Sequence, residues 1–262
     1  MPALAIDRIF RMQCWIIAAV VAAHLASRLM FAFQERESSL SKVLNMLEET
    51  SVPTVVATGS LLAAAAAAGL VALSARQQRD GLWRSWAFVT ACLVFLAVDE
   101  GAALHDRLTF PLQDMMDLGG IFYIGWVLPY LLLCVVCGVL CLKLAFALPR
   151  RTLLRFIVAG SVFVGAALGL EMIESAVIHH EAGPDTALRD ADLETIARTP
   201  LMTLLVTLEE TGELLGAALL LRALLLHLVQ DRQVSSIRLS LGQAAPEADA
   251  YVAGRNTGSR ML

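Results

Sequence analysis

The chain has 262 residues, of which 58% are hydrophobic and 17% charged, and its mean hydropathy is +0.68. A soluble domain carries about 25% charged residues, so this composition excludes an ordinary soluble globular protein and indicates that a bilayer is the solvent. The net charge of -4 and the acidic loops described below argue against a nucleic-acid-binding protein, because such a protein needs a basic surface.

Six apolar segments are long enough to cross the hydrocarbon core of a membrane, which takes about 20 helical residues. They are Phe10–Phe33, Thr54–Ala75, Ser85–Leu104, Ile121–Leu148, Phe156–His179 and Leu201–Val229. The second contains an alanine run, Ala63–Ala68, that is only mildly apolar, but small side chains let membrane helices pack closely. We therefore predict an all-α, polytopic membrane helix bundle in residues 1–230. The Gly, Ser, Ala and Pro content of residues 231–262 predicts a flexible cytoplasmic tail.

Charged residues alternate in sign between the connections of these segments. Arginines precede the first segment and lie in the second–third and fourth–fifth connections: Arg8, Arg11, Arg76, Arg79, Arg84, Arg150, Arg151 and Arg155. Acids follow the third and fifth segments: Asp106, Asp114, Asp117, Glu181, Asp185, Asp190, Asp192 and Glu194. Basic connections stay in the cytoplasm. We therefore expect a multi-pass protein of a bacterial-type inner (plasma) membrane, with both termini cytoplasmic and the lipid bilayer as its first partner.

One outer connection and one segment end carry weaker patterns. Leu40, Val43, Leu44 and Leu47 have helical spacing, which predicts a short amphipathic helix at the outer surface. Tyr123, Trp126 and Tyr130 begin the fourth segment and fit an interfacial aromatic belt, although Tyr130 could also face a cavity.

Three of the apolar segments contain acids near their predicted outer ends. The third holds Asp99 and Glu100, the fifth holds Glu171 and Glu174, and the sixth holds Glu209, Glu210 and Glu213. A charge at the bilayer centre costs about 2.5–3.5 kcal/mol on insertion scales, so these carboxylates need neutralisation or solvation. Their depths overlap, and His24 and Arg28 share a face of the first segment at a similar depth. We predict one polar chamber in the outer half of the bilayer.

Carboxylates from several helices, together with histidine, form the usual ligand set of a metal site in a helix bundle. The pairs Glu171/Glu174, Glu210/Glu213 and Glu209/Glu213 each share a helical face. Asp99 and Asp106 also share a face, whereas His105 lies well round the helix from Asp99 and Glu100 and joins them only if the helix end frays. The usual Glu-x-x-His motif is absent.

The predicted cofactor is a divalent or transition metal ion, or two such ions, among which iron, zinc and manganese are not distinguished. The candidate ligands are Glu100, Glu171, Glu174, Glu210, Glu213, His24, His105 and Asp99. Two alternatives stay open at this point: a cavity filled with water and shared protons, and structural pairing of the acids with Arg28.

The leading functional hypothesis is a metal-dependent membrane enzyme, a hydrolase or an oxidoreductase, that acts on a lipid or another apolar substrate from the outer side. Glu209 is then the expected proton acceptor and Arg28 the group that meets an anion of the substrate. The alternative is a cation or proton transporter or channel that uses the same carboxylates. A metal-sensing or assembly subunit of a larger complex is a third hypothesis.

Overall fold

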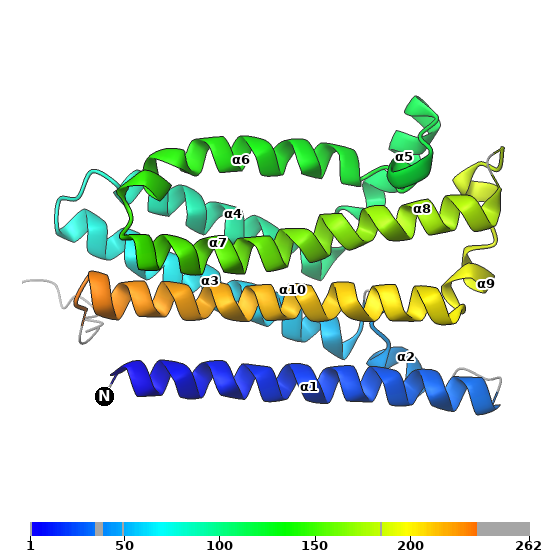
Figure 1. Cartoon of the computed structure of the whole chain (residues 1–262), viewed down its shortest axis with the longest axis horizontal. Helices are drawn as coiled ribbons and strands as arrows, with labels where there is room; N and C mark the ends of the chain where they lie inside the picture. Colours follow the sequence, from blue (N-terminus) through cyan, green and yellow to red (C-terminus); the bar gives the residue numbers. More distant parts are fainter. Residues whose placement is uncertain (1, 35–38, 49, 184, 235–262) are drawn as a thin grey trace, which may run out of the picture.

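The computed structural model describes residues 2–34, 39–48, 50–183 and 185–234 of the chain. Helix makes up 85% of these residues, and they contain no strand. Six helical rods are long and apolar enough to cross a membrane: Leu4–Met30, Val52–Gln77, Trp83–Ala102, Val127–Ala147, Arg150–Ala182 and Pro200–Asp231. They run side by side in an elongated bundle (Figure 1). The prediction of an all-α bundle with six candidate spans is confirmed, and the predicted tail lies outside the described residues except for its first four.

The elements follow one another as α-helices with short 3-10 and π-helical pieces between them. The α-helices are α1 (Pro2–Gln34), α2 (Ser39–Leu44), α3 (Val52–Gln77), α4 (Trp83–Ala102), α5 (Asp106–Met116), α6 (Val127–Ala147), α7 (Arg150–Val164), α8 (Glu171–Ala182), α9 (Leu193–Ala197) and α10 (Pro200–Leu226). The 3-10 turns are η1 (Gly120–Phe122) and η3 (Leu188–Asp190), and the π-helical pieces are η2 (Gly165–Leu170) and η4 (His227–Asp231).

Several helix ends differ from the predicted ones for local reasons. α6 begins at Val127 rather than at position 121 because Gly120, with φ +61°, starts a 3-10 turn there. α10 begins at Pro200, where the missing N–H costs nothing, and the Thr199 hydroxyl accepts a hydrogen bond from the Met202 N–H. The predicted surface helix after α1 exists as the short α2, in which Leu40 and Val43 are exposed.

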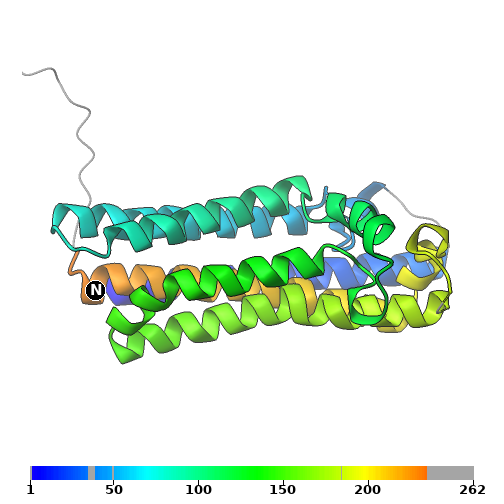
Figure 2. The ribbon, with the colours of Figure 1, turned by 90° about the horizontal axis from the view of Figure 1, so that it is seen from above.

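α10 is the central helix of the bundle, packed against α1, α3 and the rod formed by α7, η2 and α8. Figure 2 shows α3 and α4 side by side as a pair above this layer. The alanine run of α3 lies in the core: Ala64, Ala65, Ala67 and Ala68 are at most 3% exposed, as expected for small residues that allow close approach.

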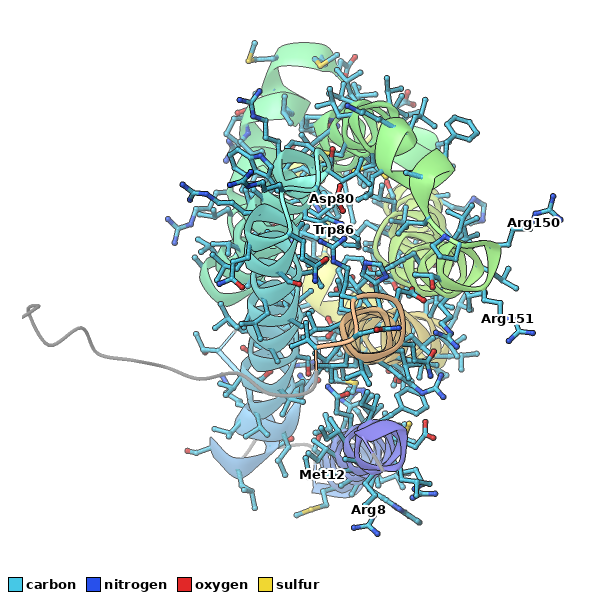
Figure 3. All side chains as sticks on the ribbon, turned by 90° about the vertical axis from the view of Figure 1, so that its left-hand side faces the viewer. Arg8, Met12, Asp80, Trp86, Arg150 and Arg151 are labelled. Atoms are coloured by element: carbon cyan, nitrogen blue, oxygen red, sulfur yellow. The ribbon has the colours of Figure 1, made fainter. Side chains whose placement is uncertain are left out.

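The two ends of the bundle differ in chemistry. α1 begins and α10 ends at the same end (Figure 1), and Arg8, Arg150 and Arg151 extend outward there (Figure 3). Next to this end, an apolar core closes the bundle with Val71, Trp86, Leu221 and Leu224, each at most 6% exposed. The short helices α2, α5 and α9 lie at the opposite end. The bundle therefore has an arginine-rich end with an apolar core next to it, and a capped end.

Candidate functional site

A cavity of about 260 Å³ opens between the helices toward the capped end. Six glutamates line it: Glu100 from α4, Glu171 and Glu174 from α8, and Glu209, Glu210 and Glu213 from α10. His105, Asp106, Trp126 and Thr54 add polar groups, and the remaining wall is apolar: Met46, Leu47, Ile178, Leu193, Ala197, Met202 and Val206. All six glutamates that the sequence places in the chamber therefore converge on one cavity.

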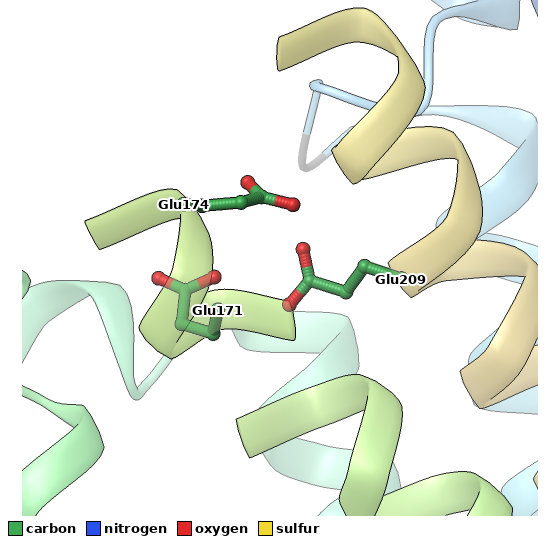
Figure 4. A group of neighbouring side chains, drawn as sticks. All are labelled: Glu171, Glu174 and Glu209. Carbon is green, nitrogen blue, oxygen red and sulfur yellow. The ribbon is translucent and has the colours of Figure 1, made fainter. Parts of the chain in front are cut away.

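Glu171, Glu174 and Glu209 form the tightest cluster of acids. One carboxyl oxygen of each lies within 4.8 Å of those of the other two, and the three side chains point toward one another (Figure 4). Glu174 is 4% exposed and Glu209 is 8% exposed. Three carboxylates at this separation repel one another strongly away from water, so the cluster needs shared protons or a cation between its members.

Glu174 has one carboxyl oxygen that its protein surroundings do not satisfy. Its Oε1 atom is buried and has no hydrogen-bond partner among the described residues. A buried carboxyl oxygen without a partner costs free energy of folding. A metal ion held between the three carboxyls would supply the missing partner.

Helix packing next to the cluster explains how α8 and α10 come so close. A Cβ atom on Gly212 would lie 2.6 Å from Ala166 Cβ, and one on Gly216 would lie 2.7 Å from Phe163 Cα. Only glycine therefore allows α10 to contact the α7–η2 rod at this separation. Glu209 lies one turn before Gly212, which places its carboxyl beside α8.

The π-helical piece η2 ends immediately before Glu171. In a continuous α-helix, Glu171 would be rotated by about 80° from Phe163, which lies eight residues earlier. The wider turn of a π-helix reduces this rotation, so that Phe163 and Glu171 both face α10. Sequence periodicity does not reveal such a turn.

Glu100, Glu210 and Glu213 extend the acidic wall of the cavity. Glu213 lies near enough to Glu210, Glu100 and Glu171 for their charges to interact, and Glu100 lies near His105 and Asp106. Because these groups come from α4, α8 and α10, the site depends on the packing of three separate spans.

Asp99 and His105 lie differently from the sequence-based expectation. α4 ends at Ala102, and Ala103 adopts the left-handed conformation with φ 47°, so the chain turns and Asp106 begins α5 instead of continuing the same helix. Asp99 therefore does not share a helical face with Asp106. His105 returns to Asp99, whose Oδ1 accepts a hydrogen bond from the His105 N–H at 3.0 Å and whose Oδ2 lies 3.0 Å from His105 Nδ1.

Two further candidates, His24 and Arg28, lie outside the cavity wall. His24 is fully buried, and its Nδ1 accepts a hydrogen bond from the Met46 N–H at 3.1 Å. Arg28 donates to the Ala197 carbonyl at 3.1 Å and to the Thr203 hydroxyl at 3.2 Å. In the structure, both side chains position wall segments of the cavity: His24 holds the segment with Met46, and Arg28 ties α1 to α9 and α10.

Residues 13–228 match the family described as a domain of unknown function (DUF8692). The chain belongs to this family. The matched region contains every candidate site residue, from His24 to Glu213. No curated protein and no solved structure matches the chain.

In this DUF8692 member, three aromatic residues that the sequence predicted in an interfacial belt lie inside the bundle. Tyr123 and Trp126 are 1% and 6% exposed, so they do not form an interfacial belt. Trp126 lines the cavity, and the Tyr130 hydroxyl donates to Asp99 Oδ1 at 2.6 Å. The only signal in the sequence was their position at the outer end of a span, which an interfacial belt explains equally well.

Proposed function

We propose that this chain is a membrane-embedded, metal-dependent enzyme, a hydrolase or an oxidoreductase, whose carboxylate site acts on a lipid or another apolar molecule. The observation that carries the proposal is the convergence of Glu171, Glu174 and Glu209 in one cavity, with a buried Glu174 oxygen that has no hydrogen-bond partner among the described residues. The proposal extends to one or two divalent or transition metal ions, with iron, zinc and manganese as candidates.

The donor set suits such an ion. Carboxylate oxygens bind divalent cations, and a nearby imidazole favours transition metals over calcium or magnesium. A bound ion would supply an activated water or oxygen species to the substrate. In this scheme Glu171, Glu174 and Glu209 hold the ion, so the expected proton acceptor moves from Glu209 to the neighbouring Glu210 or Glu213.

The apolar part of the wall supports the substrate class. Met46 and Leu47 follow α2, Leu193 and Ala197 belong to α9, and Met202 lies in the first turn of α10. The cavity therefore offers apolar side chains to an apolar tail and carboxyls to a polar reacting group. This arrangement fits an amphiphile such as a lipid better than a fully hydrated solute.

The remainder of the bundle supports an enzyme over the alternative, a cation or proton transporter. A transport path needs polar groups from the carboxylates to the other end of the bundle. Instead, buried apolar residues of α3, α4 and α10 follow the site along the bundle, including Leu61, Ala97 and Ala217, each at most 2% exposed. Carboxylates with an apolar barrier on one side suit catalysis better than transport.

The membrane orientation belongs to the same proposal. The arginine groups of α1, the α3–α4 connection and the α6–α7 connection extend from one end of the bundle. The positive-inside rule assigns this end to the cytoplasm and the carboxylate cavity to the outer half of a bacterial-type inner membrane.

Elemental analysis of the purified protein tests the metal site. We expect stoichiometric transition metal in the natural protein and little in the double variant Glu171→Gln plus Glu209→Gln, because two anionic ligands are lost while the side-chain volume is kept. Glu181→Gln is the matched control, since Glu181 is an exposed glutamate on the same helix. Natural protein without stoichiometric metal, or a double variant that retains it, would overturn the proposal.

Flux measurements separate enzyme from transporter. Protein reconstituted in liposomes is expected to show no pH-dependent or cation-dependent current above that of empty liposomes. A current that disappears in the double variant would instead favour the transporter.

A further inference from the structure

We infer that the substrate of the proposed site is an amphiphile with a cationic amine headgroup, held beside Glu100 and Glu213, and not a lipid with an anionic headgroup. This inference rests on the proposed function, because it names the substrate class of the same cavity. It is carried by the charge of the cavity wall, by the lack of ion-pair partners for these two glutamates, and by the apolar residues around them.

The charged groups of the cavity wall are nearly all acidic. Six glutamates and Asp106 line the cavity, and the described residues that line it include no lysine and no arginine. The basic side chain in the wall, His105, lies 3.0 Å from the Asp99 carboxylate, which offsets a charge on its ring. Protons shared among the acids reduce the negative charge but do not reverse it. A phosphate or carboxylate headgroup would therefore meet groups of its own sign, which disfavours binding.

Arg28, the expected contact for an anion of the substrate, does not supply a positive group to this wall. It is not one of the residues that line the cavity. Its guanidinium donates to the Ala197 carbonyl at 3.1 Å and to the Thr203 hydroxyl at 3.2 Å. The structure thus favours a substrate of the opposite charge.

Glu100 and Glu213 offer a place for the cationic headgroup. They come from α4 and α10, are half-buried, and lie near enough to each other for their charges to interact. Among the described residues, neither forms an ion pair with a basic side chain. Carboxylates within a membrane need neutralisation, and an ammonium group would provide it while donating N–H groups to their oxygens. Glu213 also lies near Glu171, so the headgroup would be next to the proposed metal cluster.

A metal ion in the three-glutamate cluster does not remove the demand for a cation. The buried Glu174 Oε1 has no partner among the described residues, so the protein does not satisfy the cluster by itself. A divalent ion there would offset charge on the three cluster carboxyls. The other acids of the wall, three glutamates and Asp106, lie outside the cluster and remain acidic. A cavity that holds a metal ion therefore still favours a cationic headgroup.

The rest of the wall fits an amphiphile of this kind. Met202 and Val206 of α10 and Ile178 of α8 provide apolar surface for the tail in the same cavity as the acids. Trp126 adds an indole, which is the aromatic side chain that attracts amine cations most strongly. Tail and headgroup would thus both find suitable partners in one cavity.

Equilibrium binding of three dodecyl amphiphiles to the purified full chain in a neutral detergent tests the headgroup. Dodecylamine, dodecanol and dodecyl phosphate share one apolar chain and differ in charge. We expect dodecylamine to bind more tightly than dodecyl phosphate by roughly 10-fold or more, the smallest effect of a close charge pair away from water. Dodecanol should lie between them. This comparison needs only the natural protein.

A double variant tests the two glutamates. Glu100→Gln plus Glu213→Gln removes both charges at nearly constant side-chain volume and should lose most of the preference for dodecylamine over dodecanol. Glu181→Gln is the matched control, because Glu181 is exposed on α8, and it should keep the preference. A double variant that keeps the preference, or a control that loses it equally, would overturn the assignment to Glu100 and Glu213.

The metal content of the same samples separates this inference from the proposed function. If dodecyl phosphate binds as tightly as dodecylamine, the cationic headgroup is wrong and the metal-dependent enzyme with an apolar substrate stands. If no dodecyl amphiphile binds to protein that contains metal, this inference and the apolar substrate are both wrong. Preferential binding of dodecylamine to natural protein without metal would support the cationic headgroup and overturn the metal site.

Discussion

Gly212 and Gly216 set the distance between α10 and the rod that carries Glu171 and Glu174. The distances at which their missing Cβ atoms would meet Ala166 and Phe163, 2.6 and 2.7 Å, are shorter than side chains tolerate without a backbone shift. Two hydrogen atoms in place of methyl groups thus allow carboxyls from two spans to lie in one cluster. The arrangement of the acids therefore depends on these two glycines as well as on the acids themselves.

Gly216→Ala is expected to destabilise the protein by about 1–3 kcal/mol, because the added methyl group overpacks the contact with Phe163. The measurement is the thermal unfolding midpoint in detergent. Gly160→Ala on α7 is the control, since a Cβ there meets nothing within 4 Å and its midpoint should not fall. Equal midpoints for the two variants would contradict the proposed close packing.

At the scale of elements, a change in helix geometry lies next to acids on two of the rods. The π-helical η2 alters the rotation of α8 just before Glu171, and the left-handed Ala103 ends α4 and brings His105 back to Asp99. Non-glycine residues in the left-handed region cost about 1–2 kcal/mol, and such strain is common next to functional sites. The connection after α4 therefore has a defined conformation, which brings His105 to Asp99 beside the cavity.

Ala103 offers a test of this turn. Ala103→Val should lower the unfolding midpoint, because a β-branched residue disfavours a φ of 47° and the turn that brings His105 to Asp99 is lost. Ala103→Gly should keep the midpoint, since glycine adopts this conformation readily. Equal midpoints for the valine and glycine variants would contradict a left-handed conformation at position 103.

At the scale of the whole molecule, chemistry is divided between the two ends of the bundle. The arginine-rich end and the capped end are separated by a core of alanine, valine and leucine, and the carboxylates lie only toward the capped end. An apolar core of this kind separates the carboxylates from the arginine-rich end. The expected orientation follows from the arginines, because basic connections stay cytoplasmic.

Cysteine labelling of intact cells tests this orientation. Met115→Cys on α5 lies at the capped end and is expected to react with a membrane-impermeant maleimide from outside, because Met115 is 80% exposed. Gln77→Cys, at the end of α3 and beside the arginines, should react only after the cells are opened. The natural cysteines lie within the spanning helices, so the unsubstituted protein provides the background. Labelling in the reverse order would invert the proposed topology.

The sequence by itself determined the solvent, the number of candidate spans and the set of acids, because these depend on local composition and on distance along a helix axis. The six glutamates of the cavity were all predicted, since burial of a carboxylate in an apolar helix is costly enough to stand out in the sequence. Helical periodicity also predicted correctly that Glu171 and Glu174 share a face.

Only the tertiary structure decided which groups meet. Helical periodicity gives the angle of each side chain around its own helix but not the position of a neighbouring helix. It also gives wrong angles where the α-helical geometry changes, as it does at η2 and at Ala103. For this reason periodicity did not predict that His105 contacts Asp99. Asp99, which was predicted in the chamber, is not among the residues that line the cavity. His24 and Arg28, which share the right depth, lie outside the wall because depth fixes one coordinate and packing fixes the other two.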